Sequence, residues 1–128
     1  MGLYISDEEL EKMRDSYPEV EEFYQLSELY KIMSDPNRLK IIFALRMHEM
    51  CVSDLSKLLN QSQSSISHAL ANFRTLNLVR YRKENNCTLY SLSDDHIENI
   101  FAMGLEHIEE RWEYGKRSQC LQLSFSFP

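Results

Sequence analysis

Apolar positions along most of the chain recur three and four residues apart, which predicts a mainly helical fold. The first predicted helix, residues 7–14, is short and charged, and Tyr17-Pro18 interrupts it. Pro18 suits the first turn of a second helix that ends near Ser34. One stripe of this second helix is apolar and consists of Val20, Phe23, Leu26, Leu29, Tyr30 and Met33.

Three more helices are predicted in the middle of the chain. The first covers residues 36 to about 47, with Asp35 as its N-cap and Pro36 in its first position. The second covers residues 52–59, and the third follows the turn at 60–62, with Ser62 as its N-cap, and ends near residue 76. Their apolar side chains are Leu39, Ile42, Phe43, Leu45, Val52, Leu55, Leu58, Leu59, Ile66, Leu70 and Phe73.

A β-hairpin is predicted next, because residues 78–83 and 87–92 are rich in β-formers. Asn85-Asn86 suits the tight turn between them, since asparagine tolerates positive φ. Ser93 is then expected to cap a last helix. Two short helices around a turn, followed by a hairpin, make a winged helix-turn-helix, so the fold class is mainly α with a β-hairpin wing. The last helix carries Ile97, Ile100, Phe101, Gly104, Leu105, Ile108 and Trp112 at helical spacing.

The length of 128 residues indicates one domain. We divide it into an acidic N-terminal arm (1–16), a winged helix-turn-helix dimerisation and DNA-binding domain (17–115) and a tail (116–128) for which disorder is one interpretation. No apolar run approaches the roughly 20 residues of a membrane span, and the acidic N-terminus does not read as a secretory signal. Three cysteines without paired spacing favour a reducing cytoplasm.

The net charge of −6 conceals a basic segment. Residues 38–83 hold eight Lys or Arg against two acids, a net of +6, whereas the rest holds six bases and eighteen acids, a net of −12. A basic middle between acidic ends is typical of a nucleic-acid-binding surface. The side chains at the start of the helix that follows Ser62 are mostly small and polar, and such side chains allow close approach to a major groove. The residues expected to contact DNA are Gln63, Ser64, Ser65, Ser67 and His68 on this helix, and Arg80, Arg82 and Lys83 on the hairpin.

Asp94, His96, His107 and Glu110 provide two oxygen and two nitrogen ligands, a set that suits zinc, cobalt or nickel. On one helix, 11 positions separate the two histidines, roughly 16 Å along the axis, while zinc–nitrogen bonds are about 2 Å. A single ion therefore cannot bridge both histidines of one helix. An antiparallel second copy would bring each pair to the other, which predicts two equivalent sites that exist only in a homodimer. Acidic helix faces are also often simply solvated, and the residue pattern alone leaves both interpretations open.

The chain resembles the ArsR/SmtB family of bacterial metal-sensing repressors over about residues 20 to 113. The resemblance rests on the stretch from Ser34 to Ile42 (SDPNRLKII), on EMCVSDL, SISHAL and LVRYRK, and on Tyr90-Ser91-Leu92. The Asp-x-His-x10-His-x-x-Glu pattern is similar to that of the zinc-sensing branch. The resemblance implies a homodimer formed through N- and C-terminal helices, an inverted-repeat operator and zinc, with cobalt or nickel as alternatives, as the effector.

The resemblance also implies a cytoplasmic, metal-responsive repressor that releases its operator when metal binds, controls metal efflux or resistance genes and is not an enzyme. It further implies a link from metal to DNA. In the family, the second metal-binding histidine, His107 here, bonds through its free ring nitrogen to a backbone carbonyl just after the recognition helix. That carbonyl belongs to about Asn77, next to Phe73.

This chain departs from the family pattern at two places. Cys51-Val52-Ser53 stands where arsenic, cadmium and lead sensors have Cys-Val-Cys, so we do not expect soft-metal sensing and expect Cys51 to be a buried thiol. Asn85-Asn86 stands where relatives often have Gly-Arg, which removes one phosphate contact at the wing.

Three other functions remain to be distinguished. A winged-helix regulator with a structural or vestigial metal site would respond to another inducer. A metallohydrolase needs an open coordination position and a base, whereas four protein ligands close the shell. The acidic ends are compatible with a protein-binding winged helix, whereas the basic segment and the polar recognition helix disfavour it.

Overall fold

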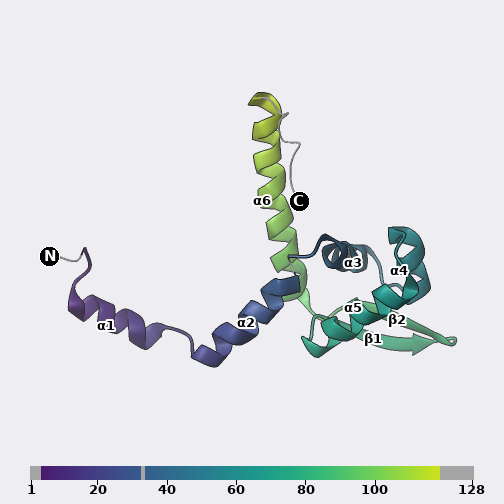
Figure 1. Ribbon diagram of the computed structural model, residues 1–128, viewed down its shortest axis with the longest axis horizontal. Helices are drawn as coiled ribbons and strands as arrows, with labels where there is room; N and C mark the ends of the chain where they lie inside the picture. The colour runs from purple at the N-terminus through teal and green to yellow at the C-terminus, as the bar shows by residue number, and fades with distance from the viewer. Residues whose placement is uncertain (1–3, 33, 119–128) are drawn as a thin grey trace. The chain divides into compact units, whose positions relative to one another are not determined.

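We describe the protein from a computed structural model, which describes residues 4–32 and 34–118 and the side chains among them up to residue 111. The chain divides into two compact units, Met1–Pro36 and Asn37–Pro128, and each is described by itself. Figure 1 labels the helices and strands of both. In the described part of the chain, no helix is both long enough and apolar enough to cross a membrane.

The first unit contains two helices, α1 (Asp7–Ser16) and α2 (Val20–Ile32). The prediction that α2 begins with Pro18 is wrong. The carbonyl of Glu19 accepts the N–H of Phe23, and the carboxylate of Glu22 accepts the N–H of Glu19 at 2.8 Å. The Glu22 carboxylate thus caps the helix at Glu19, so the helix starts later and leaves Pro18 before it.

The apolar stripe predicted on α2 is mostly exposed within this unit. Val20 is 70% exposed, Phe23 43%, Leu26 42% and Tyr30 50%. Leu29 is half-buried, Ile32 is buried, and Met33 lies outside the described residues. Such an exposed apolar helix face commonly marks a protein–protein contact.

The described residues of the second unit form four helices and a two-stranded sheet. Its helices are α3 (Pro36–Met47), α4 (Val52–Leu59), α5 (Gln63–Thr75) and α6 (Asp95–Ser118). Its strands are β1 (Val79–Glu84) and β2 (Cys87–Leu92). α5 contacts α4 on one side and β1 on another, and β2 contacts α6 (Figure 1). This is the predicted winged helix-turn-helix, in which α4 and α5 form the helix-turn-helix and the hairpin forms the wing.

The core of the second unit lies between α3, α4, α5 and the start of β1. Side chains with less than 2% exposure are Ile41, Ile42, Leu55, Ile66, Leu70, Phe73 and Leu78. The predicted stripe of α5 is therefore confirmed. On α3 the prediction was incomplete, because Ile41 and Ala44 are also buried while Leu39 and Phe43 are only half-buried. Leu58 on α4 is 57% exposed.

Asparagine occupies each described position with positive φ, namely Asn60, Asn77, Asn85 and Asn86. Asn60 ends α4 in the left-handed conformation. Asn85 and Asn86, with φ of 50° and 66°, form the two-residue turn of the hairpin, which pairs Glu84 with Cys87. Positive φ at both central positions is the type I′ pattern, so the predicted tight turn is confirmed.

α6 begins differently from the prediction. Asp94, not Ser93, is the N-cap: its Oδ1 accepts the N–H of Ile97 at 3.1 Å, and its carbonyl accepts the N–H of Glu98. The hydroxyl of Ser93 instead donates to the carbonyl of Asn77. Both residues favour N-cap positions, so the local sequence does not decide between them.

Among its described side chains, up to residue 111, α6 packs against the rest of the second unit through its first turns. Phe101 is buried and meets Phe43 edge-on at 6.3 Å between ring centroids, while Arg46 of α3 lies 3.8 Å from Glu98. Beyond this point Met103, Leu105 and Ile108 are exposed. The Trp112 side chain lies outside the described residues, as do residues 119–128 of the predicted tail.

The N-cap of α5 supports a prediction about stability. Ser62 Oγ accepts the N–H of Ser65 at 3.1 Å, so Ser62→Ala should lower the free energy of unfolding by about 1 kcal/mol. Urea denaturation followed by circular dichroism measures this loss. Ser64→Ala is the matched control, because it removes an exposed hydroxyl from the same turn. Equal stability of the two variants would contradict the capping role.

Candidate DNA interface and metal-binding residues

The N-terminal half of α5 presents a polar face to solvent. Ile66, Ala69, Leu70 and Phe73 of this helix are buried. All five residues expected on the recognition surface are exposed: Gln63, Ser64, Ser65, Ser67 and His68. The first turn adds backbone N–H groups without helical partners, which favour an anion such as a phosphate. The face can therefore approach DNA with short side chains and donor groups.

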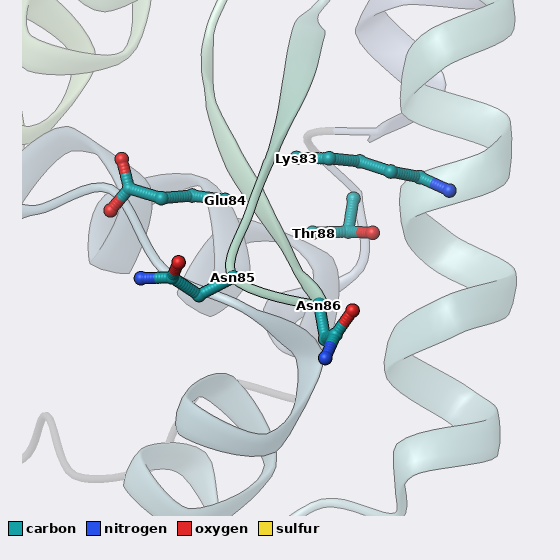
Figure 2. A pocket seen from close by; sticks show the side chains of 5 residues that line it. All are labelled: Lys83, Glu84, Asn85, Asn86 and Thr88. Atoms are coloured by element: carbon teal, nitrogen blue, oxygen red, sulfur yellow. The ribbon is translucent and has the colours of Figure 1, made fainter.

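The three basic residues of the wing do not share one face. Side chains alternate along a strand, so Arg80 and Arg82 lie opposite Lys83. Figure 2 shows Lys83 and Thr88 on one side of the ribbon and Glu84 on the other, as the pairing of Lys83 with Thr88 requires. A shallow hollow of about 340 Å³ at this tip is lined by Lys83, Glu84, Asn85, Asn86 and Thr88. It lacks the apolar lining typical of a small-molecule site.

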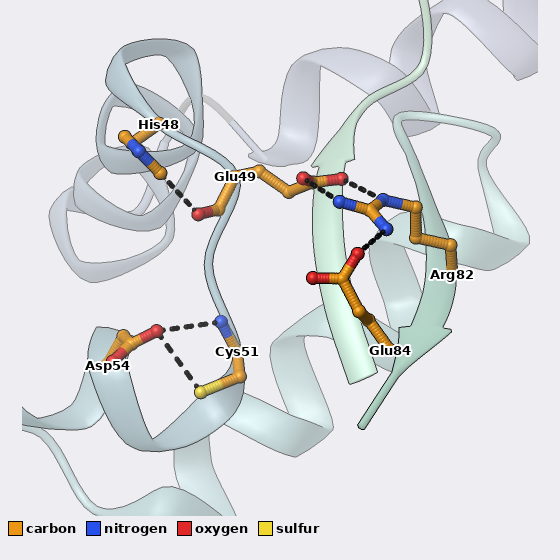
Figure 3. A network of polar contacts seen from close by, with 6 residues as sticks. All are labelled: His48, Glu49, Cys51, Asp54, Arg82 and Glu84. Atoms are coloured by element: carbon orange, nitrogen blue, oxygen red, sulfur yellow. Dashed lines mark hydrogen bonds and ion pairs between the residues drawn. The ribbon is translucent and has the colours of Figure 1, made fainter. Parts of the chain in front are cut away.

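Arg82 is bound by two carboxylates. Its Nε and Nη2 donate to the two oxygens of Glu49 at 2.9 and 2.8 Å, and its Nη1 donates to Glu84 at 2.6 Å (Figure 3). These bonds lower the pKa of Glu49, chiefly through the hydrogen bond from Arg82, and raise the pKa of the guanidinium. Arg82 therefore joins the wing to the segment before α4, and its charge is partly neutralised.

A second basic contact joins the wing to α5. The guanidinium of Arg74 lies 4.2 Å from the ring centroid of Tyr81, and the Tyr81 ring lies 6.1 Å from that of Tyr90. An arginine over an aromatic face is attractive. Neither Glu49 nor Arg74 was identified from the sequence as part of the site. The 33 positions between Glu49 and Arg82 left no local signal.

Two cysteines lie near the contacts that Arg82 makes with Glu49 and Glu84. An antiparallel bridge between Met50 and Tyr90 brings the start of α4 beside β2. Cys51 is half-exposed, so the prediction of a buried thiol is wrong, and its thiol lies 3.2 Å from a carboxylate oxygen of Asp54. The pKa of Cys87 is raised, mainly by a hydrogen bond with the neighbouring Cys51 thiol and then by desolvation. Cys87 thus stays a thiol at neutral pH, which makes it a poor nucleophile. Cys120 lies outside the described residues.

The predicted metal ligands lie as two exposed pairs. Asp94 and His96 are at the start of α6, where His96 Nδ1 is 3.7 Å from Asp94 Oδ1. His107 and Glu110 are one turn apart in the second half of the same helix. Residues 4–32 and 34–111 contain no group of three or more His, Cys, Asp or Glu side chains that could hold an ion within one chain.

The donor types nevertheless fit zinc. Imidazole nitrogens and carboxylate oxygens are common zinc ligands, and each pair exposes both chelating side chains. Two donors alone do not complete a tetrahedral shell. Each pair in one chain offers only two donors, so the predicted site requires a second chain to complete it.

The residues predicted to link the metal site to the DNA-reading helix lie at the end of α5. Phe73 is fully buried, and its carbonyl accepts the N–H of Leu78 at 2.8 Å. Asn77 has a φ of 59°, and its carbonyl accepts the Ser93 hydroxyl at 2.7 Å. The donor to Asn77 within the chain is therefore Ser93. A carbonyl has two lone pairs, so one remains for the donor predicted from His107.

Comparisons with known proteins agree with this geometry. Residues 35–81 match the family described as "Bacterial regulatory protein, arsR family". The chain is 36% identical over 104 residues to the transcriptional repressor SmtB homolog of Synechocystis sp., and the match covers 79% of each of the two chains. It is 31% identical over 86 residues to the cadmium resistance transcriptional regulatory protein CadC homolog of Staphylococcus aureus, covering 66% of this chain and 71% of that one.

A solved structure supports the fold. The homodimeric winged helix-turn-helix DNA-binding domain Mb0332 of Mycobacterium bovis has a TM-score of 0.66 and 19% identity, and the match covers 87% of this chain and 94% of that one. At this identity the likeness concerns the fold.

The Glu49–Arg82 pair supports a prediction about pH. A carboxyl whose pKa is lowered by folding stabilises the fold above its unfolded pKa, and this contribution is lost as pH falls through the lowered folded value. We expect carboxyl ¹³C NMR to place the pKa of Glu49 below 4.5 and Arg82→Gln to raise it. Lys83→Gln, which removes a charge from the opposite face, is the control. If Glu49 titrates alike in the wild type and Arg82→Gln, the ion pair does not form in solution.

Proposed function

Because this chain belongs to the ArsR/SmtB family of bacterial metal-sensing transcriptional repressors, we propose that it is a zinc-responsive repressor that releases its operator when metal binds between subunits. It is a transcriptional regulator and not an enzyme. The observation that carries the proposal is the placement of two exposed ligand pairs at separate positions on α6. We also propose a cytoplasmic location and control of metal efflux or resistance genes.

The proposed assembly is a homodimer formed by the N- and C-terminal helices. Met103, Leu105 and Ile108 of α6 are 69%, 38% and 50% exposed, and α2 exposes its own apolar stripe. A second copy would remove these side chains from water, which is favourable by roughly 25 cal/mol per Å² of apolar surface. Antiparallel α6 helices would also bring the Asp94–His96 pair of one chain to the His107–Glu110 pair of the other.

The proposed DNA contact divides the work between α5 and the wing. Gln63 and the neighbouring serines would reach base edges in the major groove, one α5 helix per half of an inverted repeat. Arg80 and Lys83 of the wing would contact phosphates of the DNA backbone. Arg82 would contribute less to DNA binding because Glu49 and Glu84 already bind it.

Bound zinc would supply two positive charges that hold four donors in one tetrahedral arrangement. The residues of α6 would thereby set the angle between the two subunits and the spacing of their α5 helices. Linkage requires that metal and operator weaken each other's binding by the same factor. The name of the CadC homolog, a cadmium resistance regulator, supports a metal effector in general, and the nitrogen and oxygen donors favour zinc, cobalt or nickel here.

The wing supports a prediction about salt dependence. Each phosphate contact contributes about 0.9 to the slope of log K against log salt. We expect Arg80→Ala to reduce this slope by about 0.9 and Arg82→Ala to reduce it by clearly less. Fluorescence anisotropy on a labelled inverted-repeat operator, taken from the DNA upstream of the gene and titrated at several salt concentrations, measures both slopes. A larger loss for Arg82→Ala would show that its ion pairs open on DNA.

Mixing two variants tests whether each site takes ligands from both subunits. His96→Ala and His107→Ala should each abolish zinc-induced operator release as homodimers, because every site loses a ligand. In a mixed heterodimer one site keeps all four ligands and the other loses two. We expect the unfolded and refolded mixture to regain zinc-dependent release in the roughly half of its dimers that are heterodimers, measured by anisotropy and reversed by a chelator.

The control mixes His96→Ala with Asp94→Ala, two changes in the same ligand pair, and should regain nothing. Recovery in this control, or none in the first mixture, would exclude the intersubunit site. If wild-type protein binds zinc stoichiometrically and its operator affinity does not change, the metal site is structural and another inducer must be sought.

A further inference from the structure

Two hydrogen bonds join Ser93, which directly precedes the N-cap of α6, to the residues after α5. The N–H of Ser93 donates to the carbonyl of Leu78 at 2.9 Å, and its hydroxyl donates to the carbonyl of Asn77 at 2.7 Å. All three residues belong to the second unit. Ser93 thus holds two consecutive carbonyls of the segment that connects the DNA-reading helix to the wing.

Backbone hydrogen bonds and burial hold the α5 side of this junction. The N–H of Leu78 donates to the carbonyl of Phe73 at 2.8 Å, and the N–H of Asn77 donates to the carbonyl of Arg74 at 3.0 Å. With Asn77 at a φ of 59°, these bonds form a Schellman motif. Phe73 and Leu78 are both fully buried. A displacement of the Asn77 carbonyl therefore moves the end of α5 rather than bending a loop.

The α6 side of the junction is the metal-ligand pair. Asp94 follows Ser93 directly, and its Oδ1 both caps α6 through Ile97 and lies 3.7 Å from His96 Nδ1. A metal ion that coordinates Oδ1 of Asp94 competes with this cap, because it takes lone-pair density of the same oxygen that accepts the N–H of Ile97. A metal ion bound at Asp94 and His96 thus acts on the backbone next to Ser93.

We propose that Ser93 is the positioning residue that transmits metal occupancy at Asp94 and His96 to α5 within the same subunit. This inference rests on the proposed zinc response and specifies its route. The hydrogen bonds of this route all lie within one chain. The route uses one neutral hydroxyl and two backbone carbonyls.

Ser93→Ala tests this route because it removes the hydroxyl bond to Asn77 and keeps both the backbone bond and the metal ligands. We expect operator Kd without metal and zinc Kd, measured by chelator competition, to stay within about threefold of wild type. Coupling is measured as the operator Kd with zinc divided by the operator Kd without zinc. In Ser93→Ala this ratio should be at least tenfold smaller than in wild type. Ser93→Thr, which keeps the hydroxyl, should retain most of the coupling.

The control is Ser91→Ala, a half-buried serine two residues earlier on β2, which should leave coupling unchanged. Hydrogen–deuterium exchange provides a readout independent of DNA. Zinc should change the exchange of the peptide containing Asn77 and Leu78 in wild type and in Ser91→Ala, but not in Ser93→Ala. If Ser93→Ala does not fold, Ser93→Cys, of similar size and a weaker donor, replaces it with the same expectation.

The outcomes separate this inference from the proposed function. If wild-type protein shows no effect of zinc on operator Kd, the proposed function fails, and the route fails with it. If wild type is coupled but Ser93→Ala retains full coupling and its zinc-dependent exchange, the proposed function stands and the Ser93 route is overturned. If Ser93→Ala loses zinc binding itself, Ser93 supports the ligand pair rather than transmitting its occupancy, which also overturns the proposal.

Discussion

The second unit depends on the burial of one face of α5. Ile66, Leu70 and Phe73 are removed from solvent almost completely, and Leu78 continues the same core into the wing. Deleting a buried side chain of the size of Phe73 typically costs 3–5 kcal/mol. This burial determines which side chains of α5 remain outside, and in the first half of the helix these are polar. It also determines where the chain leaves the helix, so the start of β1 and the position of Ser93 follow from it.

Local signals predicted most of this unit, because each element carries its own. Ser62 is an N-cap residue before a helical apolar stripe, and Asn85-Asn86 is a turn pair between two β-forming runs. Prediction failed where two neighbouring residues suit one role equally, as Ser93 and Asp94 do. It also failed at Pro18, where the capping interaction of Glu19 with Glu22 competes with a favourable proline position.

Contacts between residues far apart in the chain could not be predicted from the sequence. Glu49 and Arg82 meet because the segment before α4 lies beside the hairpin, a consequence of tertiary packing that no spacing reports. The same bridge places Cys51 near Cys87. The division of the candidate ligands into two separate pairs could be predicted, since a helix has a fixed rise per residue. Whether the pairs meet depends on a second chain, and the exposed apolar faces of α2 and α6 are the features in one chain that such a partner would cover.

The four left-handed asparagines also restrict how the sequence can vary. Left-handed backbone costs an ordinary L-residue roughly 1–2 kcal/mol, and a β-branched side chain suffers most. At Asn60, Asn77, Asn85 and Asn86 substitution is therefore limited by handedness rather than by contacts. Asparagine and glycine are interchangeable there at small cost, since glycine relieves the steric strain but gives the unfolded chain more conformational freedom. Natural drift at these turns should thus be confined to a few residue types, even at exposed positions.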